Sequence, residues 1–141
     1  MKILIICTGN TCRSQMAEGF LRSFDPKLEV YSAGTRAEQQ VNPFAIKAMA
    51  EIGIDISKQY PKQVDIFLKD TFDWVITVCD SAKEVCPVFT GKVNHRLPMG
   101  FDDPAAAKGS EKEIMSVYRR VRDEIKEQFK KFYFENIQSQ I

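Results

Sequence analysis

The sequence predicts an α/β fold, a single-domain three-layer sandwich in which helices flank a four-stranded parallel sheet. Three observations support this prediction. Strand-like and helix-like segments alternate along the chain, their connections are short, and the first strand contains the continuous apolar run "ILII", which is typical of a strand buried on both faces. With 141 residues, 44% of them hydrophobic, the chain can build one core, so we expect one domain over residues 1–141.

The first half of the chain contains two strands and two helices. "KILIIC" (2–7) is the first strand, and an amphipathic helix follows over residues 14–24 because apolar side chains recur there at helical spacing. "LEVYSAG" (28–34) is the second strand. The stretch 42–53 is a second helix, since Asn42 is placed to cap it, a proline occupies its first turn and a glycine follows its last apolar residue.

The second half repeats the alternation. "IDIS" predicts a turn, and residues 61–69 predict a short helix. "DWVITVC" (73–79) is the third strand and "KVNHRL" (92–97) the fourth, on which we expect His95 to be structural. Apolar residues at intervals of three and four then predict a long helix over 112–134. Trp74, in the third strand, is expected to be a core or sheet-face residue.

Charge and the amino-terminal segment exclude some classes of function. Twenty Lys and Arg balance 19 Asp and Glu for a net charge of +1, and the basic residues are scattered, so we expect no nucleic-acid partner. The apolar run before Cys7 is too short for a signal peptide or a membrane span. We therefore expect a cytoplasmic protein without a membrane partner. We also expect a monomer, because the sequence shows no spare apolar stripe to bury.

The segment "CTGNTCRS" (7–14) connects the first strand to the first helix. Backbone N–H groups of such a loop and of the following helical turn converge on one point and favour an anion there. The segment lacks the Gly-Lys-Ser/Thr ending of a nucleotide-binding loop. It offers instead the Cys7 thiol, the Arg13 guanidinium, which grips two oxygens of phosphate or arsenate, and the Ser14 hydroxyl, which donates to the thiolate. The residues that would surround the oxyanion are Thr8, Gly9, Asn10, Thr11, Cys12 and Arg13. The alternative is that Cys7 is only a buried strand-end residue and Arg13 a surface charge.

These motifs carry a family resemblance. "CTGNTCRSQMAEG" and the later "GFDDP" resemble the low-molecular-weight tyrosine phosphatase superfamily, and specifically its thioredoxin-coupled arsenate reductase branch, over nearly the whole chain. By this resemblance Cys79 and Cys86 of "CDSAKEVC" are a redox pair and Asp103 is a general acid. A dedicated phosphatase usually has Asp-Pro-Tyr where this chain has Asp-Pro-Ala (103–105). This difference favours the reductase.

The resemblance implies a relay of three cysteines, Cys7, Cys79 and Cys86, that reduces arsenate to arsenite and is regenerated by thioredoxin without an organic cofactor. Phosphoester hydrolysis through a Cys7 phosphocysteine is the alternative, and weak phosphatase activity is expected in either case. Asn10 is expected to fix the loop backbone, and Cys12 to pack without reacting.

The spacing of Cys79 and Cys86 bears on the relay. Seven positions on an α-helix correspond to a rise of about 10.5 Å, whereas a disulfide needs Cα atoms within about 7 Å. If residues 80–85 were helical, they would have to unwind before these cysteines could bond. The alternative is that both are small buried apolar residues.

Some members of the branch bind potassium beneath the loop, through ligands that match Asn10, Glu18 and Ser32. Their further ligands come from a Thr-x-Asp segment, where this chain has Tyr60 and Lys62, and Lys62 would bring positive charge toward the ion.

Two alternatives belong to other classes of protein. A structural zinc site would use all four cysteines, although their spacing is unlike that of zinc knuckles. A catalytically inactive oxyanion sensor would not need Cys7, Arg13 and Asp103 together.

Overall fold

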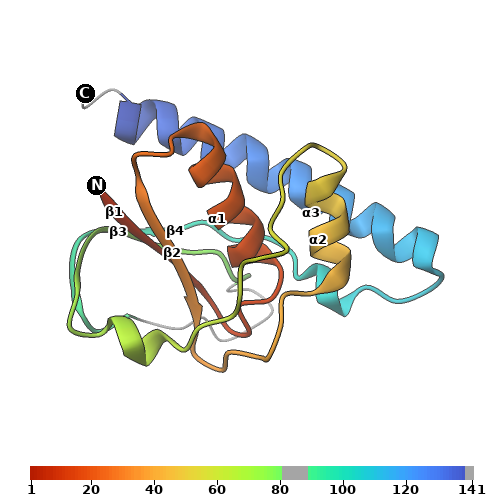
Figure 1. Cartoon of the computed structure of the whole chain (residues 1–141), viewed down its shortest axis with the longest axis horizontal. Coiled ribbons are helices and arrows are strands. Elements are labelled where there is room, and N and C mark those ends of the chain that lie inside the picture. The colour runs from red at the N-terminus through yellow and green to blue at the C-terminus, as the bar shows by residue number, and fades with distance from the viewer. Residues whose placement is uncertain (81–88, 139–141) are drawn as a thin grey trace.

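The computed structural model describes residues 1–80 and 89–138 (Figure 1). Strands and helices alternate as the sequence predicts. The strands are β1 (Lys2–Cys7), β2 (Glu29–Gly34), β3 (Thr71–Thr77) and β4 (Lys92–Pro98). The helices are α1 (Arg13–Phe24), α2 (Pro43–Ala50), α3 (Glu111–Phe132), the 3-10 turns η1 (Val64–Phe67) and η2 (Pro104–Ala106), and the π-helical turn η3 (Tyr133–Ile137).

The four strands form one parallel sheet in the order β2-β1-β3-β4. Cys7 pairs with Gly34 of β2, and Ile6 with Thr77 of β3. The carboxyl ends of the central strands therefore meet at one edge of the sheet, which is where open α/β sheets bind ligands. The predicted fold class is confirmed.

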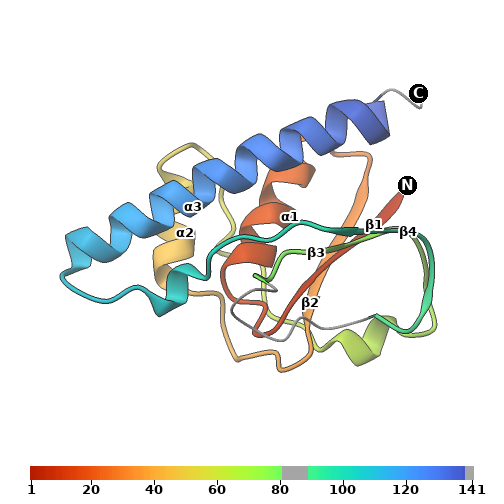
Figure 2. The same cartoon turned by 180° about the vertical axis from the view of Figure 1, so that it is seen from behind.

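Two apolar layers hold the sheet. Alternate residues of β1, such as Ile3 and Ile5, pack under α1, α2 and α3 in the larger core. The other residues, such as Leu4 and Ile6, pack against Phe67 of η1 on the opposite face. Figures 1 and 2 show the three α-helices on one side of the sheet and η1 on the other. Burial of β1 on both faces explains its continuous apolar sequence.

Several boundaries differ from the sequence prediction. Helix α2 has the predicted cap, in which the Asn42 side chain accepts from the Phe44 N–H at 2.9 Å, but it ends at Ala50 because the chain turns through Gly53 at φ +82°. The short helix predicted over 61–69 is only the 3-10 turn η1. Strand β3 ends at Thr77, so the expectation that Cys79 ends this strand is wrong by two residues.

Trp74 and His95 pack against each other at the β4 edge of the sheet. Trp74 stacks on His95 of the edge strand β4, with ring centroids 4.6 Å apart, and its ring meets Phe132 edge to face at 5.0 Å. Both residues therefore have the structural roles that the sequence predicts.

Among residues 1–80 and 89–138, no helix combines the length and the apolar character needed to cross a membrane.

Gly34, at the end of β2, lies directly against the loop that follows β1. A Cβ atom at this position would stand 2.4 Å from the Thr8 carbonyl oxygen and 3.2 Å from the Asn10 Cβ. The Gly34 N–H also donates to the Lys62 carbonyl at 2.8 Å. A glycine is needed here because two backbone segments pass too close for any side chain.

We expect Gly34→Ala to lower the free energy of unfolding by about 1–3 kcal/mol, since the added methyl must displace backbone rather than a flexible side chain. Gly9→Ala is the matched control, because the nearest atom to its Cβ would be 3.7 Å away. Urea denaturation of both variants checks this expectation. Equal stability of the two variants would contradict it.

Candidate active site

The Cys7 sulfur lies at the base of the segment that joins β1 to α1, which we call the oxyanion loop (residues 7–14). It is 3% exposed and lies 3.3 Å from the Asn10 N–H and 2.9 Å from the Ser14 Oγ. The Asn10 side-chain amide donates to that same Oγ at 2.7 Å, which leaves the hydroxyl hydrogen of Ser14 for the sulfur. Two hydrogen-bond donors, the Asn10 N–H and the Ser14 hydroxyl, thus point at one sulfur atom.

Asn10 gives the oxyanion loop its curvature. Its φ of 57° is in the left-handed region, which asparagine tolerates better than most residues. The buried Gln15 amide donates to both the backbone and the side-chain oxygens of Asn10, at 3.0 and 3.1 Å, and the Lys62 N–H donates to the side-chain oxygen at 2.9 Å. The expected role of Asn10 in fixing the loop is consistent with these contacts.

Gln15 and Gln59 were not identified from the sequence, and Lys62 was identified only as a charge near the potassium site, not as a partner of Asn10. Gln59 donates to the side-chain oxygen of Gln15 at 2.8 Å and so orients the amide that holds Asn10. The signal available in the sequence was a glutamine in the first turn of α1. Only the structure shows that this polar side chain is fully buried. Its partners Gln59 and Tyr60 lie more than 40 positions away, beyond the range of any local pattern.

Arg13 and Asp103 meet above the loop. Arg13 begins α1 and is buried, and its guanidinium donates to the Phe101 carbonyl at 3.1 Å, which fixes the direction of the side chain. The Asp103 carboxylate is 3.8 Å from the same guanidinium and half-exposed, and it also caps η2 by accepting from the Ala105 N–H at 3.0 Å. The sequence-predicted cation and acid are therefore brought together.

A pocket opens above the Cys7 sulfur. The oxyanion loop forms its floor, and segment 36–38 is bound to the loop through the Arg36 and Glu38 N–H groups, which donate to the Thr8 and Gly9 carbonyls at 2.9 and 3.1 Å. None of the described side chains that line this pocket is aromatic. Its walls include Arg36, Glu38, Asp80, Asp102, Asp103, Arg120 and the alanines 105–107.

The remaining cysteines differ in their positions. Cys79 is buried and follows β3 by two residues, at the same sheet edge as Cys7. Cys86 lies outside the described residues, as does most of the segment whose unwinding the spacing argument considered.

Cys12 belongs to the loop but packs against helix α3. Its sulfur is 3.5 Å from the Tyr118 hydroxyl, and burial raises the pKa of its thiol from 9.0 to about 11. Burial likewise raises the pKa of Tyr118. A thiol that keeps its proton at neutral pH is a poor nucleophile, in agreement with the packing role expected for Cys12.

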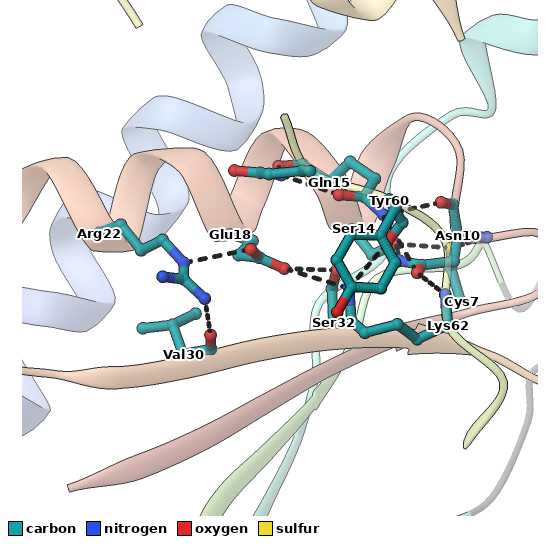
Figure 3. A network of polar contacts seen from close by, with 11 residues as sticks. Cys7, Asn10, Ser14, Gln15, Glu18, Arg22, Val30, Ser32, Tyr60 and Lys62 are labelled. Atoms are coloured by element: carbon teal, nitrogen blue, oxygen red, sulfur yellow. Dashed lines mark hydrogen bonds and ion pairs between the residues drawn. The ribbon is translucent and has the colours of Figure 1, made fainter. Parts of the chain in front are cut away.

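A charged cluster lies beneath the loop, where the sequence places the potassium ligands (Figure 3). Glu18 is almost completely buried in α1. One of its carboxylate oxygens accepts from the Ser32 hydroxyl at 2.7 Å and lies 4.0 Å from the Lys62 Nζ, and the other pairs with the Arg22 Nε at 3.1 Å. Burial lowers the pKa of Lys62, and the Glu18 carboxylate opposes this shift.

The described residues do not fit a potassium ion. The oxygens of Asn10 and Glu18 already accept hydrogen bonds or face cations. An ion bound to Glu18 would also lie near the Lys62 ammonium, whose like charge would repel it.

The family follows from the fold and this loop together. Residues 2–141 match the family described as "Low molecular weight phosphotyrosine protein phosphatase". The chain therefore belongs to this family, and the resemblance seen in its motifs is confirmed.

Arsenate reductases are among the relatives to which this chain is similar. The arsenate reductase of Halalkalibacterium halodurans is 50% identical over 131 residues, which cover 92% of this chain and 93% of the relative. A solved arsenate reductase in a phosphate-binding state has a TM-score of 0.79 at 32% identity, with 96% of this chain and 98% of that chain covered. The thioredoxin-dependent arsenate reductase of Corynebacterium glutamicum has a TM-score of 0.63 at 27% identity, with 96% and 63% covered.

The raised pKa of Cys12 predicts a pH-dependent stability. Between pH 9 and about 11 the unfolded chain releases the Cys12 proton and the folded chain retains it, so the thiol's contribution to stability is lost as pH rises. Relative to Cys12→Ala, the wild type should lose about 2–3 kcal/mol of unfolding free energy over this range. Urea denaturation at several pH values measures the difference, and parallel curves for the two proteins would contradict the prediction.

Proposed function

We propose that this protein reduces arsenate to arsenite with a relay of Cys7, Cys79 and Cys86, and that thioredoxin regenerates it. The observation that carries the proposal is the Cys7 sulfur, which receives two hydrogen-bond donors at the floor of a pocket that Arg13 and Asp103 border. The arsenate reductases at up to 50% identity support the choice of substrate.

In the first step, the Cys7 thiolate attacks arsenic in arsenate held by the loop N–H groups and Arg13. A sulfur–arsenic bond forms and an arsenic–oxygen bond breaks, and Asp103 supplies the proton with which that oxygen leaves as water. Fixed N–H donors and a guanidinium held by Phe101 stabilise the developing negative charge without reorganisation.

In the second step, the Cys79 thiolate attacks the Cys7 sulfur. The electron pair of the sulfur–arsenic bond passes to arsenic, which leaves as arsenite, and a Cys7–Cys79 disulfide remains. Cys86 then attacks Cys79, which frees the Cys7 thiolate and leaves a Cys79–Cys86 disulfide. A dithiol of thioredoxin takes up the oxidation by exchange, and the thioredoxin-dependent relative from C. glutamicum supports this choice of reductant.

The described pocket wall offers no aromatic side chain on which the ring of a phosphotyrosine could stack. An aromatic substrate binds best between apolar or aromatic walls. The described walls carry alanines 105–107 and several charged side chains, with carboxylates at Glu38, Asp80, Asp102 and Asp103. Phosphoester hydrolysis is the second candidate, because the loop binds phosphate by the same contacts and the family is named for that activity.

The relay predicts how two substitutions act on coupled turnover. NADPH consumption with arsenate, thioredoxin and thioredoxin reductase should fall to background in Cys79→Ser and in Cys86→Ser, because each removes a thiol that the transfer needs. Arsenate turnover that survives either change would overturn the relay.

The same variants provide an internal control through phosphate chemistry. We expect slow hydrolysis of p-nitrophenyl phosphate that is abolished by Cys7→Ser and unchanged in Cys79→Ser and Cys86→Ser, because cleavage of a phosphocysteine by water needs neither of the last two thiols. Phosphate hydrolysis without any arsenate turnover would make the protein a phosphatase. A wild type that reduces arsenate but is inert toward aryl phosphate would contradict the shared first step.

A further inference from the structure

The cluster beneath the oxyanion loop contains one cation that the family resemblance does not provide, the side chain of Lys62. It reaches the Tyr60 carbonyl at 2.7 Å and lies 4.0 Å from the Glu18 carboxylate, and its Nζ is 4.7 Å from the centre of the Tyr60 ring. Although Lys62 is in a loop, only 12% of its side chain is exposed. Carboxylate, carbonyl and ring all face the ammonium, and the carboxylate opposes the burial that lowers the pKa of Lys62.

The backbone of Lys62 fixes this position. Its N–H donates to the Asn10 side chain at 2.9 Å, and its carbonyl accepts from the Gly34 N–H at 2.8 Å. The side chain therefore starts from a point held between the oxyanion loop and the end of β2. In Figure 3 it extends from there toward Glu18.

The one buried carboxylate of the cluster already faces two cations. Glu18 supplies one buried negative charge, and it lies between the Arg22 guanidinium at 3.1 Å and the Lys62 ammonium. No net negative charge remains for a free cation. The oxygens that would bind one already accept hydrogen bonds from the Ser32 hydroxyl, the Gln15 amide and the Lys62 N–H.

We propose that the Lys62 ammonium is a built-in cation that takes the place of a bound potassium ion beneath the oxyanion loop, so that this protein needs no monovalent metal there. Lys62 is then a positioning residue. Its charge holds Glu18, and its backbone holds the Asn10 side chain that orients Ser14 and Cys7.

The test compares melting temperatures in potassium chloride and in choline chloride at equal ionic strength, a readout that does not depend on the proposed reaction. The wild type should melt at the same temperature in both salts. Lys62→Ala should melt a few degrees lower in choline and recover about 2–4 °C in potassium, as expected for a vacated site that binds the ion.

Two controls define the site. Lys69→Ala removes an exposed lysine a few residues along the chain, and this variant should melt at the same temperature in potassium chloride and in choline chloride. The double variant Lys62→Ala with Glu18→Gln lacks the carboxylate and should lose the potassium response of the single variant. Lys62→Gln, which keeps much of the side-chain length, replaces the alanine variant if the latter does not fold.

Each outcome decides the proposal. A wild type indifferent to potassium together with a Lys62 variant that responds supports it. A wild type stabilised by potassium shows that the ion binds with the lysine present, and a Lys62 variant that responds no more than Lys69→Ala shows that the ammonium fills no cation position. Either result overturns the proposal, as does a double variant that still responds.

Discussion

The structure of the candidate site depends on the burial of one asparagine. Asn10 has a left-handed backbone conformation, which costs about 1 kcal/mol or more for a residue with a side chain. The conformation persists because every polar group of the fully buried side chain has a partner, from Ser14 on one side to Gln15 and Lys62 on the other. A buried amide without partners would cost about 1–3 kcal/mol for each group left unpaired. The same curvature turns the Asn10 N–H toward the Cys7 sulfur, so the constraint that shapes the loop also creates the environment of the nucleophile.

The parallel sheet explains why the other chemical groups gather around this loop. Strands β1 and β3 are neighbours that run in the same direction, so the segments that follow them reach the same edge although about 70 residues separate them. Arg13 begins the helix that leaves β1, and the Phe101 carbonyl after β4 holds its guanidinium in place. Asp103 is then fixed as the cap of η2, within 4 Å of that guanidinium. Arg13, Asp103 and Cys7 come from different elements, and the rigid backbones of these elements hold the three groups in a fixed geometry around one pocket.

Beneath the loop, the constraint is a buried charge. A carboxylate removed from water must be paired, and Glu18 meets this requirement with Arg22 from its own helix and Lys62 from a distant loop. The lysine also contacts the loop through its backbone, so charge compensation and loop geometry share one residue.

The sequence by itself determined the features that depend on short-range pattern. Apolar periodicity placed the strands and α1, Asn42 and Pro43 placed the start of α2, and the spacing of Cys7, Arg13 and Ser14 identified the oxyanion loop, because each signal lies within a few positions of its structural consequence. Only the tertiary structure decided where α2 and β3 end, that Arg13 is clamped by Phe101, and that Cys12 packs on Tyr118, 106 positions away. It also revealed the support that Gln15, Gln59 and Lys62 give to Asn10. Apart from the Gln15–Asn10 pair, these contacts join residues far apart in the chain. Their partners are set by how the helices and loops pack on the sheet, which no local pattern encodes.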